Sequence, residues 1–226
     1  KTSTLSSRVF KSMARAAVLL LSTGLIIHPA IAETPEKRGL AIAQEADRRD
    51  VGFGDTKANM TMTLRNAHGD TAERSLRVRT LEQSNDGDKS LLIFDNPGDV
   101  KGTAFLSFTH KVDPDDQWLY LPSLKRVKRI SQSNQSGPFV GSEFAYEDLS
   151  SQEVEKYTYK YLRDESFDGR DHFVVEADPV NPKSGYSRQV IWFGKAHYRV
   201  WKIDFYDRRG SHLKTLTVSD YQRYLE

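Results

Sequence analysis

The chain has 226 residues and a formal net charge of +2 at pH 7, with 33 Lys and Arg residues against 31 Asp and Glu residues. Four of the basic residues and none of the acidic residues lie in residues 1–32, so residues 33–226 carry a net charge of −2. This charge gives no support for a nucleic-acid-binding protein. The chain contains no cysteine, which excludes thiol catalysis, cysteine metal sites and a lipid-modified cysteine.

Residues 1–32 have the three parts of a secretion signal. These parts are a positive start (Arg8, Lys11 and Arg15), an apolar run (residues 16–27) and a small-x-small cleavage site (Ala30, Ile31 and Ala32). The apolar run is too short for a spanning helix, which needs about 20 residues. We therefore predict a cleaved signal, with an uncleaved membrane anchor as the alternative. Residues 33–226 are then long enough to form a single domain with a core.

Residues 39–50 predict an amphipathic helix, because Leu40, Ala43 and Ala46 share one face of it. After two glycines the period changes to two, which predicts a β-hairpin with one apolar and one polar face. The side chains expected to point inward are Met60, Met62, Leu64, Leu76 and Val78, and those expected to point outward are Arg65, Arg77 and Arg79. A slip of one residue would exchange the two faces.

Further short strands with turns between them follow along the chain. They are expected at residues 90–94, 103–110, 118–121, 157–161, 172–177, 189–193, 199–206 and 212–218. About ten or eleven strands at short, regular spacing favour an all-β sandwich or barrel with few helices. The longest helix is expected before the first strand.

The chain shows no coherent catalytic set. The histidines form no HExxH spacing, and the sequence has no GxSxG, GxGxxG or P-loop motif. Acidic pairs such as Glu143 with Glu147 and Asp148 with Glu153 are more typical of solvated loops than of catalysis. We therefore predict no enzyme activity, no catalytic residues, no cofactor and no bound metal.

The most specific part of the sequence is residues 117–149. An aromatic strand, WLYL, ends at Pro122 and is followed by the basic run KRVKR at residues 125–129, a polar loop at residues 131–141, and then Phe144 and Tyr146. Other specific segments are DRRDVGFGDTKANMTMTL at residues 47–64, DLSSQEVEKYTY at 148–159, GYSRQVIWF at 185–193 and IDFYDRRGSHLKTLT at 203–217. In order and spacing, these segments resemble the outer-membrane lipoprotein-sorting protein family, a LolA-like group, over residues 45–222.

The resemblance implies a curved, half-open antiparallel β-barrel with a few helices against its concave face. It also implies a soluble periplasmic carrier that binds acyl chains of lipoproteins or other lipids for transfer towards the outer membrane, working with an RND/MMPL-type exporter. Two alternatives stay open: a periplasmic lipid-sensing or regulatory module that docks a membrane protein, and an enzyme acting on envelope lipids.

A curved sheet with few helices leaves apolar side chains to be covered, which makes a lipid-binding cavity plausible. The residues expected to line it are Met60, Met62, Leu64, Leu76, Val78, Phe94, Trp118, Tyr120, Phe144 and Tyr146. For each of them the alternative role is an ordinary packed core. Which side of its strand Trp118 occupies is open at this point.

The basic run has two interpretations. Lys125, Arg126, Lys128 and Arg129 either mark a solvated strand edge, where such residues prevent edge-to-edge pairing, or form a docking surface for anionic headgroups or an acidic partner. The expected partners are lipid or lipoprotein acyl chains, an inner-membrane exporter and a transiently contacted membrane. No nucleic acid is expected, and the protein is expected to be a monomer.

Overall fold

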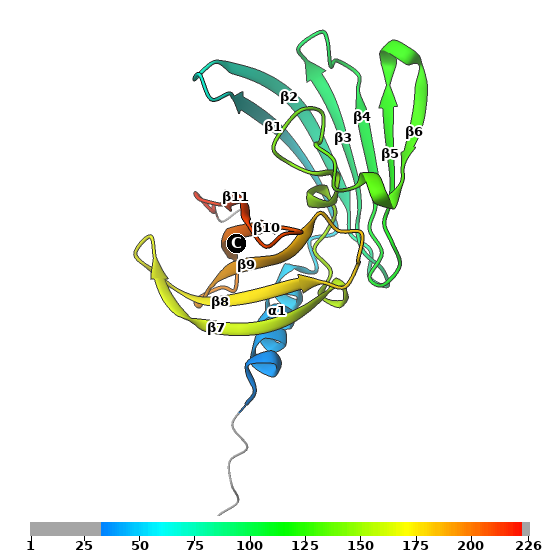
Figure 1. Cartoon of the computed structure of the whole chain (residues 1–226). Coiled ribbons are helices and arrows are strands. Elements are labelled where there is room, and N and C mark those ends of the chain that lie inside the picture. The colour runs from blue at the N-terminus through cyan, green and yellow to red at the C-terminus, as the bar shows by residue number, and fades with distance from the viewer. Residues whose placement is uncertain (1–32, 223–226) are drawn as a thin grey trace, which may run out of the picture. The chain divides into compact units, whose positions relative to one another are not determined.

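The structure is a computed structural model, and it describes residues 33–222 of the chain. Residues 1–32, where the secretion signal is predicted, and residues 223–226 lie outside the described residues. Eleven strands of the described part form two antiparallel sheets, one with six strands and one with five. Figure 1 shows both sheets as curved layers. The predicted strand number and antiparallel pairing are confirmed.

The six-stranded sheet is a meander in which each strand pairs with its chain neighbours. Its strands are β1 (Asp55–Arg65), β2 (Thr71–Leu81), β3 (Lys89–Asn96), β4 (Ala104–Phe108), β5 (Asp116–Leu121) and β6 (Arg126–Ile130). The five-stranded sheet is a second meander, made of β7 (Tyr157–Phe167), β8 (Arg170–Pro179), β9 (Tyr186–Gly194), β10 (Val200–Asp207) and β11 (His212–Thr217). Neither sheet closes on itself, so β1, β6, β7 and β11 are edge strands.

The described residues contain one α-helix, α1 (Pro35–Asp50), so the predicted few helices reduce to this helix and short 3₁₀ turns. These turns are η1 (Pro122–Leu124), η2 (Gln132–Asn134), η3 (Tyr146–Leu149) and η4 (Val154–Lys156). The Thr34 side chain caps α1 by accepting a hydrogen bond from the Lys37 N–H at 3.2 Å. No helix among the described residues is both long and apolar enough to cross a membrane.

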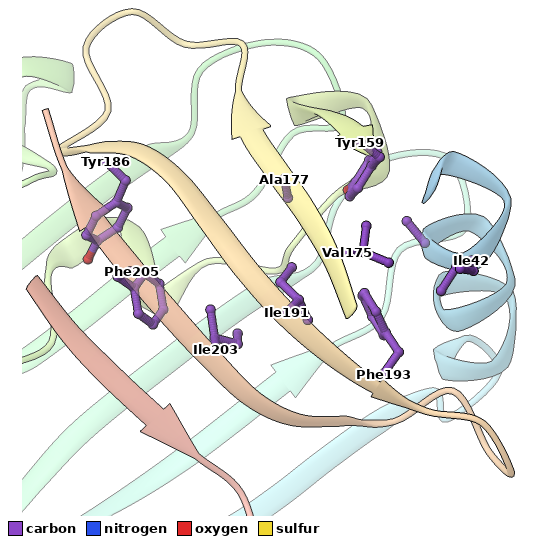
Figure 2. Packing of buried hydrophobic residues seen from close by; sticks show 10 residues of the cluster. Ile42, Tyr159, Val175, Ala177, Tyr186, Ile191, Phe193, Ile203 and Phe205 are labelled. Carbon is purple, nitrogen blue, oxygen red and sulfur yellow. The ribbon is translucent and has the colours of Figure 1, made fainter. Parts of the chain in front are cut away.

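Helix α1 packs on β7 and β8 and buries Gly39, Ile42 and Ala43. The predicted face was therefore wrong by a small rotation, because Leu40 is 39% exposed. Figure 2 shows Ile42 beside the side chains of the five-stranded sheet. This first core cluster contains Ile42, Ala43, Tyr159, Val175, Ala177, Tyr186, Ile191, Phe193, Ile203 and Phe205.

A second core cluster covers the inner face of the six-stranded sheet. Its buried members are Leu76, Leu92, Phe94, Val100, Phe105, Leu119, Ile130 and Phe139. Phe139 comes from the loop after β6, and its ring centroid lies 5.9 Å from that of Phe94 and 5.4 Å from that of Phe105. The loop that the sequence predicted as polar therefore supplies the apolar cover of this sheet.

The hairpin of β1 and β2 has the register that the alternation predicts. Met60 pairs with Leu76, so these two side chains share a face, and Arg77 lies on the other face opposite Asn59. By the same alternation Met62, Leu64 and Val78 lie on the inner face, while Arg65 and Arg79 lie on the outer face. Arg74, which the alternation did not predict to be inward, also lies on the inner face, where it donates to the Val140 carbonyl at 2.5 Å.

The parity of β5 is opposite to the one that a cavity lined by Trp118 and Tyr120 requires. Leu119 and the fully buried Gln117 point inward, and Gln117 donates to the Tyr146 carbonyl at 3.0 Å. Trp118 and Tyr120 therefore lie on the outer face of the six-stranded sheet, and their assignment to the concave face was wrong. The physical reason is that a hydrogen-bonded amide occupies an inner position that hydrophobicity alone would give to the aromatic rings.

We expect Gly39→Ala to destabilise the fold by about 1–3 kcal/mol, the usual cost of overpacking. A Cβ at Gly39 would lie 2.6 Å from the Tyr161 nitrogen and 2.8 Å from Lys160 backbone atoms. Alanine otherwise favours a helix by about 1 kcal/mol over glycine, so a net loss isolates this contact. Urea unfolding followed by circular dichroism measures the change. Gly98→Ala is the control, because no heavy atom lies within 4 Å of its added Cβ. Equal stabilities for both variants would contradict the close packing of α1.

Candidate functional site

Two cavities adjoin the segment that links the sheets. The smaller has a volume of about 480 Å³ and the larger about 1560 Å³. Both are lined by Asp148, Ser150, Ser151 and Gln152, so this segment is a wall that they share. We refer to them as the smaller and the larger cavity.

The smaller cavity has the more apolar wall. Its lining includes six large apolar and aromatic side chains, Phe144, Tyr157, Tyr186, Ile203, Phe205 and Leu216. Four of these six come from β9, β10 and β11, whose first core cluster continues into the wall (Figure 2). Val112 and Val180 also line it and are 81% and 57% exposed, so apolar surface lies open to water there. A volume of this size is typical of a site for a small apolar ligand.

Two tyrosines give the wall an amphipathic character. The Tyr186 ring centroid lies 4.9 Å from that of Phe205, and its hydroxyl donates to the Asp148 carboxylate at 2.7 Å. The Tyr157 hydroxyl accepts a hydrogen bond from the Gln189 amide at 3.4 Å. Burial raises the pKa of both tyrosines, so both stay neutral at any ordinary pH. Their polar ends are thus bound by protein groups while their rings remain apolar surface.

The cations of the wall are paired. Lys214 donates to the Asp148 carboxylate at 2.5 Å and to the Glu143 carbonyl at 2.8 Å, and the side chains of Lys214 and Asp148 are only 16% and 7% exposed. Lys156 forms an ion pair with Asp115. The lining therefore presents no unpaired lysine to a ligand. Such a wall favours a ligand that binds through apolar contact.

Glu147 lies beside this ion pair and is held by the chain that leads into β9. It accepts hydrogen bonds from the Gly185 N–H and from the Ser184 hydroxyl, both at 2.8 Å. Burial nevertheless raises the pKa of Glu147. A Cβ on Gly185 would lie 2.9 Å from the Glu147 carboxylate, so the glycine permits this close approach.

The larger cavity is more polar. Burial raises the pKa of Asp47, Asp50 and Glu153 along its wall. Glu82 fixes the loop between α1 and β1 by accepting from the Gly52 N–H at 2.5 Å and the Gly54 N–H at 2.6 Å. Exposed apolar residues along this cavity are Val51, Phe53, Leu81 and Tyr221. Within residues 33–222, no group of three or more His, Asp and Glu side chains is placed to hold a metal ion.

The predicted cavity residues are largely brought together, but mostly as a packed core. Leu76 and Phe94 are buried in the second core cluster, and Met62, Val78, Phe144 and Tyr146 pack against it. Met60, by contrast, is 49% exposed and Leu64 is half-buried. Of the ten predicted residues only Phe144 lines the smaller cavity, and none lines the larger. Whether they contact a lipid stays a prediction.

The cavity wall contributed by the five-stranded sheet was not predicted from the sequence. Ile203 and Phe205 are two residues apart on β10, so their side chains lie on the same face, and Leu216 pairs directly with Ile203. This alternation is visible in the sequence. What the sequence does not indicate is that the loop at Phe144 lies against these strands, because that contact joins residues far apart in the chain.

A protein-family model described as "Uncharacterized protein" matches residues 86–226, which is more than half of the chain. No curated protein matches the chain. Among solved structures, a Vibrio parahaemolyticus domain described as an outer membrane lipoprotein-sorting protein is 57% identical, with a TM-score of 0.82. That match covers 84% of this chain and 80% of the Vibrio chain.

Two further solved structures are similar. A DUF1329 family protein from Desulfovibrio piger is 30% identical with a TM-score of 0.77, covering 82% of this chain and 79% of its own. A LolA superfamily protein from Nitrosomonas europaea is 24% identical with a TM-score of 0.62, covering 86% of this chain and 81% of its own. The last likeness concerns the fold alone. It confirms the predicted fold class, a mainly β, open, barrel-like antiparallel structure.

We expect Lys214→Met to destabilise the protein by about 3 kcal/mol, the usual cost of leaving a buried carboxylate without its cation. Asp148 would lose its charged partner while keeping the bonds from Tyr186 and from the Ala145 N–H. Urea unfolding measures the change, and adding Asp148→Asn should recover part of the loss.

The control for this variant is Arg163→Met. Arg163 pairs with Glu165 at 2.5 Å, but the two side chains are 52% and 34% exposed. An exposed pair of this kind contributes at most about 1 kcal/mol. If Lys214→Met were no more destabilising than this control, the pair would not hold the sheets together.

We expect Glu147→Gln to gain stability relative to the native protein as the pH rises above 4.5, the ordinary pKa of this carboxyl group. The unfolded chain loses the Glu147 proton near that pH, whereas burial keeps the folded-state pKa higher, so native stability falls as the pH rises between the two values. Urea unfolding at a series of pH values measures this, and parallel curves would contradict it.

Glu82→Gln is the control, and its effect on stability should depend on pH in the opposite direction. The Gly52 and Gly54 N–H groups lower the pKa of Glu82. Glu82→Gln should therefore be less stable than the native protein above pH 4.5, and the difference should close as the pH falls through the lowered folded-state pKa.

Proposed function

The chain belongs to the outer membrane lipoprotein-sorting protein family, a LolA-like group, and on that premise we propose that it carries acyl chains of lipoproteins or other lipids. The observation that carries the proposal is the smaller cavity, with its apolar wall and its exposed apolar valines. A bound acyl chain would cover this surface.

The energetics favour a chain-like apolar ligand. Each methylene that moves from water into an apolar site contributes about 0.8 kcal/mol. Several methylenes within a volume of about 480 Å³ therefore give useful affinity without specific polar contacts. The wall fits this, because its two lysines are already paired with Asp115 and Asp148.

The proposal is for a binding protein and not an enzyme. Two adjacent carboxylates that line the smaller cavity are engaged by donors of the fold, Asp148 by Lys214 and Tyr186, and Glu147 by Ser184 and Gly185. Their roles in holding the two sheets account for them without a reaction.

The wider setting is also part of the proposal. Secretion by a signal within residues 1–32 would place the protein in the periplasm, and family resemblance suggests transfer towards the outer membrane with an RND/MMPL-type exporter as partner. The protein would act as a monomer that contacts the membrane transiently. Site-specific cross-linking in cells, from a photoreactive residue at Val180, would identify such a partner.

We expect Leu216→Trp to weaken binding of a fluorescent fatty acid by roughly ten-fold or more, because the larger side chain occupies volume that several methylenes need. Leu216 lines the smaller cavity. Leu213→Trp is the matched control, since Leu213 lies on the same strand, β11, but is 54% exposed and does not line the cavity. Fluorescence titration at fixed probe concentration compares the three proteins.

The native protein should also yield lipid when it is purified from the periplasm without detergent and extracted for mass spectrometry. Equal probe binding by both tryptophan variants would place the ligand elsewhere. A native protein that binds no fatty acid and yields no lipid would overturn the carrier function in favour of a regulatory module that docks a protein.

A further inference from the structure

The edge strand β6 carries an unusual combination of side chains. It ends the six-stranded sheet and pairs with β5 on one side. All side chains from Leu124 to Arg129 are exposed, with Leu124 at 62% and Val127 at 66%. These six consecutive residues, which we call the β6 edge, contain four cations and two exposed apolar side chains. No acidic residue lies between Asp116 and Glu143.

The cations of the β6 edge point to both sides of the sheet. Arg126 pairs with Leu121 and Lys128 with Leu119, so both share the inner side, whereas Arg129 pairs with Trp118 on the outer side. Arg129 forms an ion pair with Asp116. Among residues 33–222, no acidic side chain lies within ion-pair distance of Lys125, Arg126 or Lys128. The predicted docking surface is therefore an edge with charge on two sides, and not one flat patch.

The outer face beside this edge is apolar. Tyr120 lies opposite Val127, and Trp118 lies opposite Leu106 on β4. The Trp118 ring packs edge-on against Phe108, with 5.2 Å between centroids. Leu106, Phe108, Trp118 and Tyr120 are half-buried, and none belongs to a core cluster. Apolar surface therefore continues from the β6 edge onto the outer face of β5.

On the other sheet, basic side chains lie over the outer aromatic rings, as Lys89 lies over Phe108 on this sheet with its ammonium 4.8 Å from the ring centroid. Trp192 is 4% exposed, and the Lys202 ammonium lies 4.1 Å from its ring centroid. The Arg188 guanidinium lies 4.1 Å from the Tyr206 ring centroid. Long basic side chains thus cover that face. At the β6 edge, by contrast, the basic side chains stand beside exposed apolar ones and do not cover them.

We infer that the β6 edge, with Trp118 and Tyr120, docks on the surface of a bilayer that contains anionic lipid. Cations attract anionic headgroups, apolar side chains enter the interface, and Trp and Tyr favour that depth. A bilayer fits better than an acidic protein, because cations on both sides of a strand cannot all meet one rigid surface. A headgroup layer into which the edge dips meets them all. This inference goes beyond the proposed cavity function and does not depend on it.

The test is binding of the full chain to vesicles of phosphatidylcholine with phosphatidylglycerol, compared with vesicles of phosphatidylcholine alone. The native protein should co-sediment with the anionic vesicles only, and added salt should weaken this binding. Arg126→Ser with Lys128→Ser should weaken it by roughly ten-fold or more. Lys160→Ser with Arg209→Ser is the control, since it removes the same charge from exposed positions of the other sheet and should leave binding unchanged.

A fluorescent probe gives a second measurement, because the chain has no native cysteine. An environment-sensitive dye on Val127→Cys should shift its emission on anionic vesicles, whereas the same dye on Val180→Cys, at the smaller cavity, should not. Leu216→Trp should keep vesicle binding even if it loses fatty acid, which separates this inference from the cavity function. Equal weakening by both double variants, binding that ignores salt or lipid charge, or a native protein that binds neither vesicle would overturn the inference.

Discussion

Two adjacent carboxylates, Glu147 and Asp148, join the two sheets. They lie on the segment that leaves the six-stranded sheet. Glu147 accepts hydrogen bonds from Ser184 and Gly185, which lie just before β9. Asp148 accepts from Tyr186, the first residue of β9, and from Lys214 of β11. The same segment carries Phe139 into the second core cluster. The apolar cover of one sheet and the wall of the smaller cavity therefore depend on one set of buried hydrogen bonds, where a lost partner is costly.

The role of the basic side chains differs from one part of the molecule to another. Inside, the lysines of the smaller cavity are paired, so the wall acts as apolar surface. On the outer face of the five-stranded sheet, basic side chains cover aromatic rings. At the β6 edge, within residues 33–222, Lys125, Arg126 and Lys128 have neither role, and only Arg129 is paired, with Asp116. Basic side chains therefore take part in packing at the cavity and on the five-stranded sheet, but remain exposed to water at the β6 edge, although residues 33–226 carry a net charge of only −2.

Period-two patterns predicted the strands and the hairpin register correctly, because one buried face selects one register. The side that faces inward was harder to predict where polar residues are buried. Gln117 and Ser107 are fully buried on the inner face, and both contact the Ser150 hydroxyl, so Trp118 was assigned to the wrong side. The cavity wall at Phe205 was not predicted, because it also depends on a contact between residues far apart in the chain. The loop at Phe144 lines the same cavity, and a single sequence does not indicate that contact.

The wall shared by the two cavities has a geometric consequence. Because Asp148 and residues 150–152 line both spaces, a change in this segment affects the volume of both cavities. A larger side chain at Ser150 or Ser151 would therefore take volume from one or both of the cavities. Asp148 is bonded to Tyr186 and Lys214 of one sheet, and Ser150 to Gln117 and Ser107 of the other, so any change in how the space is divided between the cavities acts on both sheets.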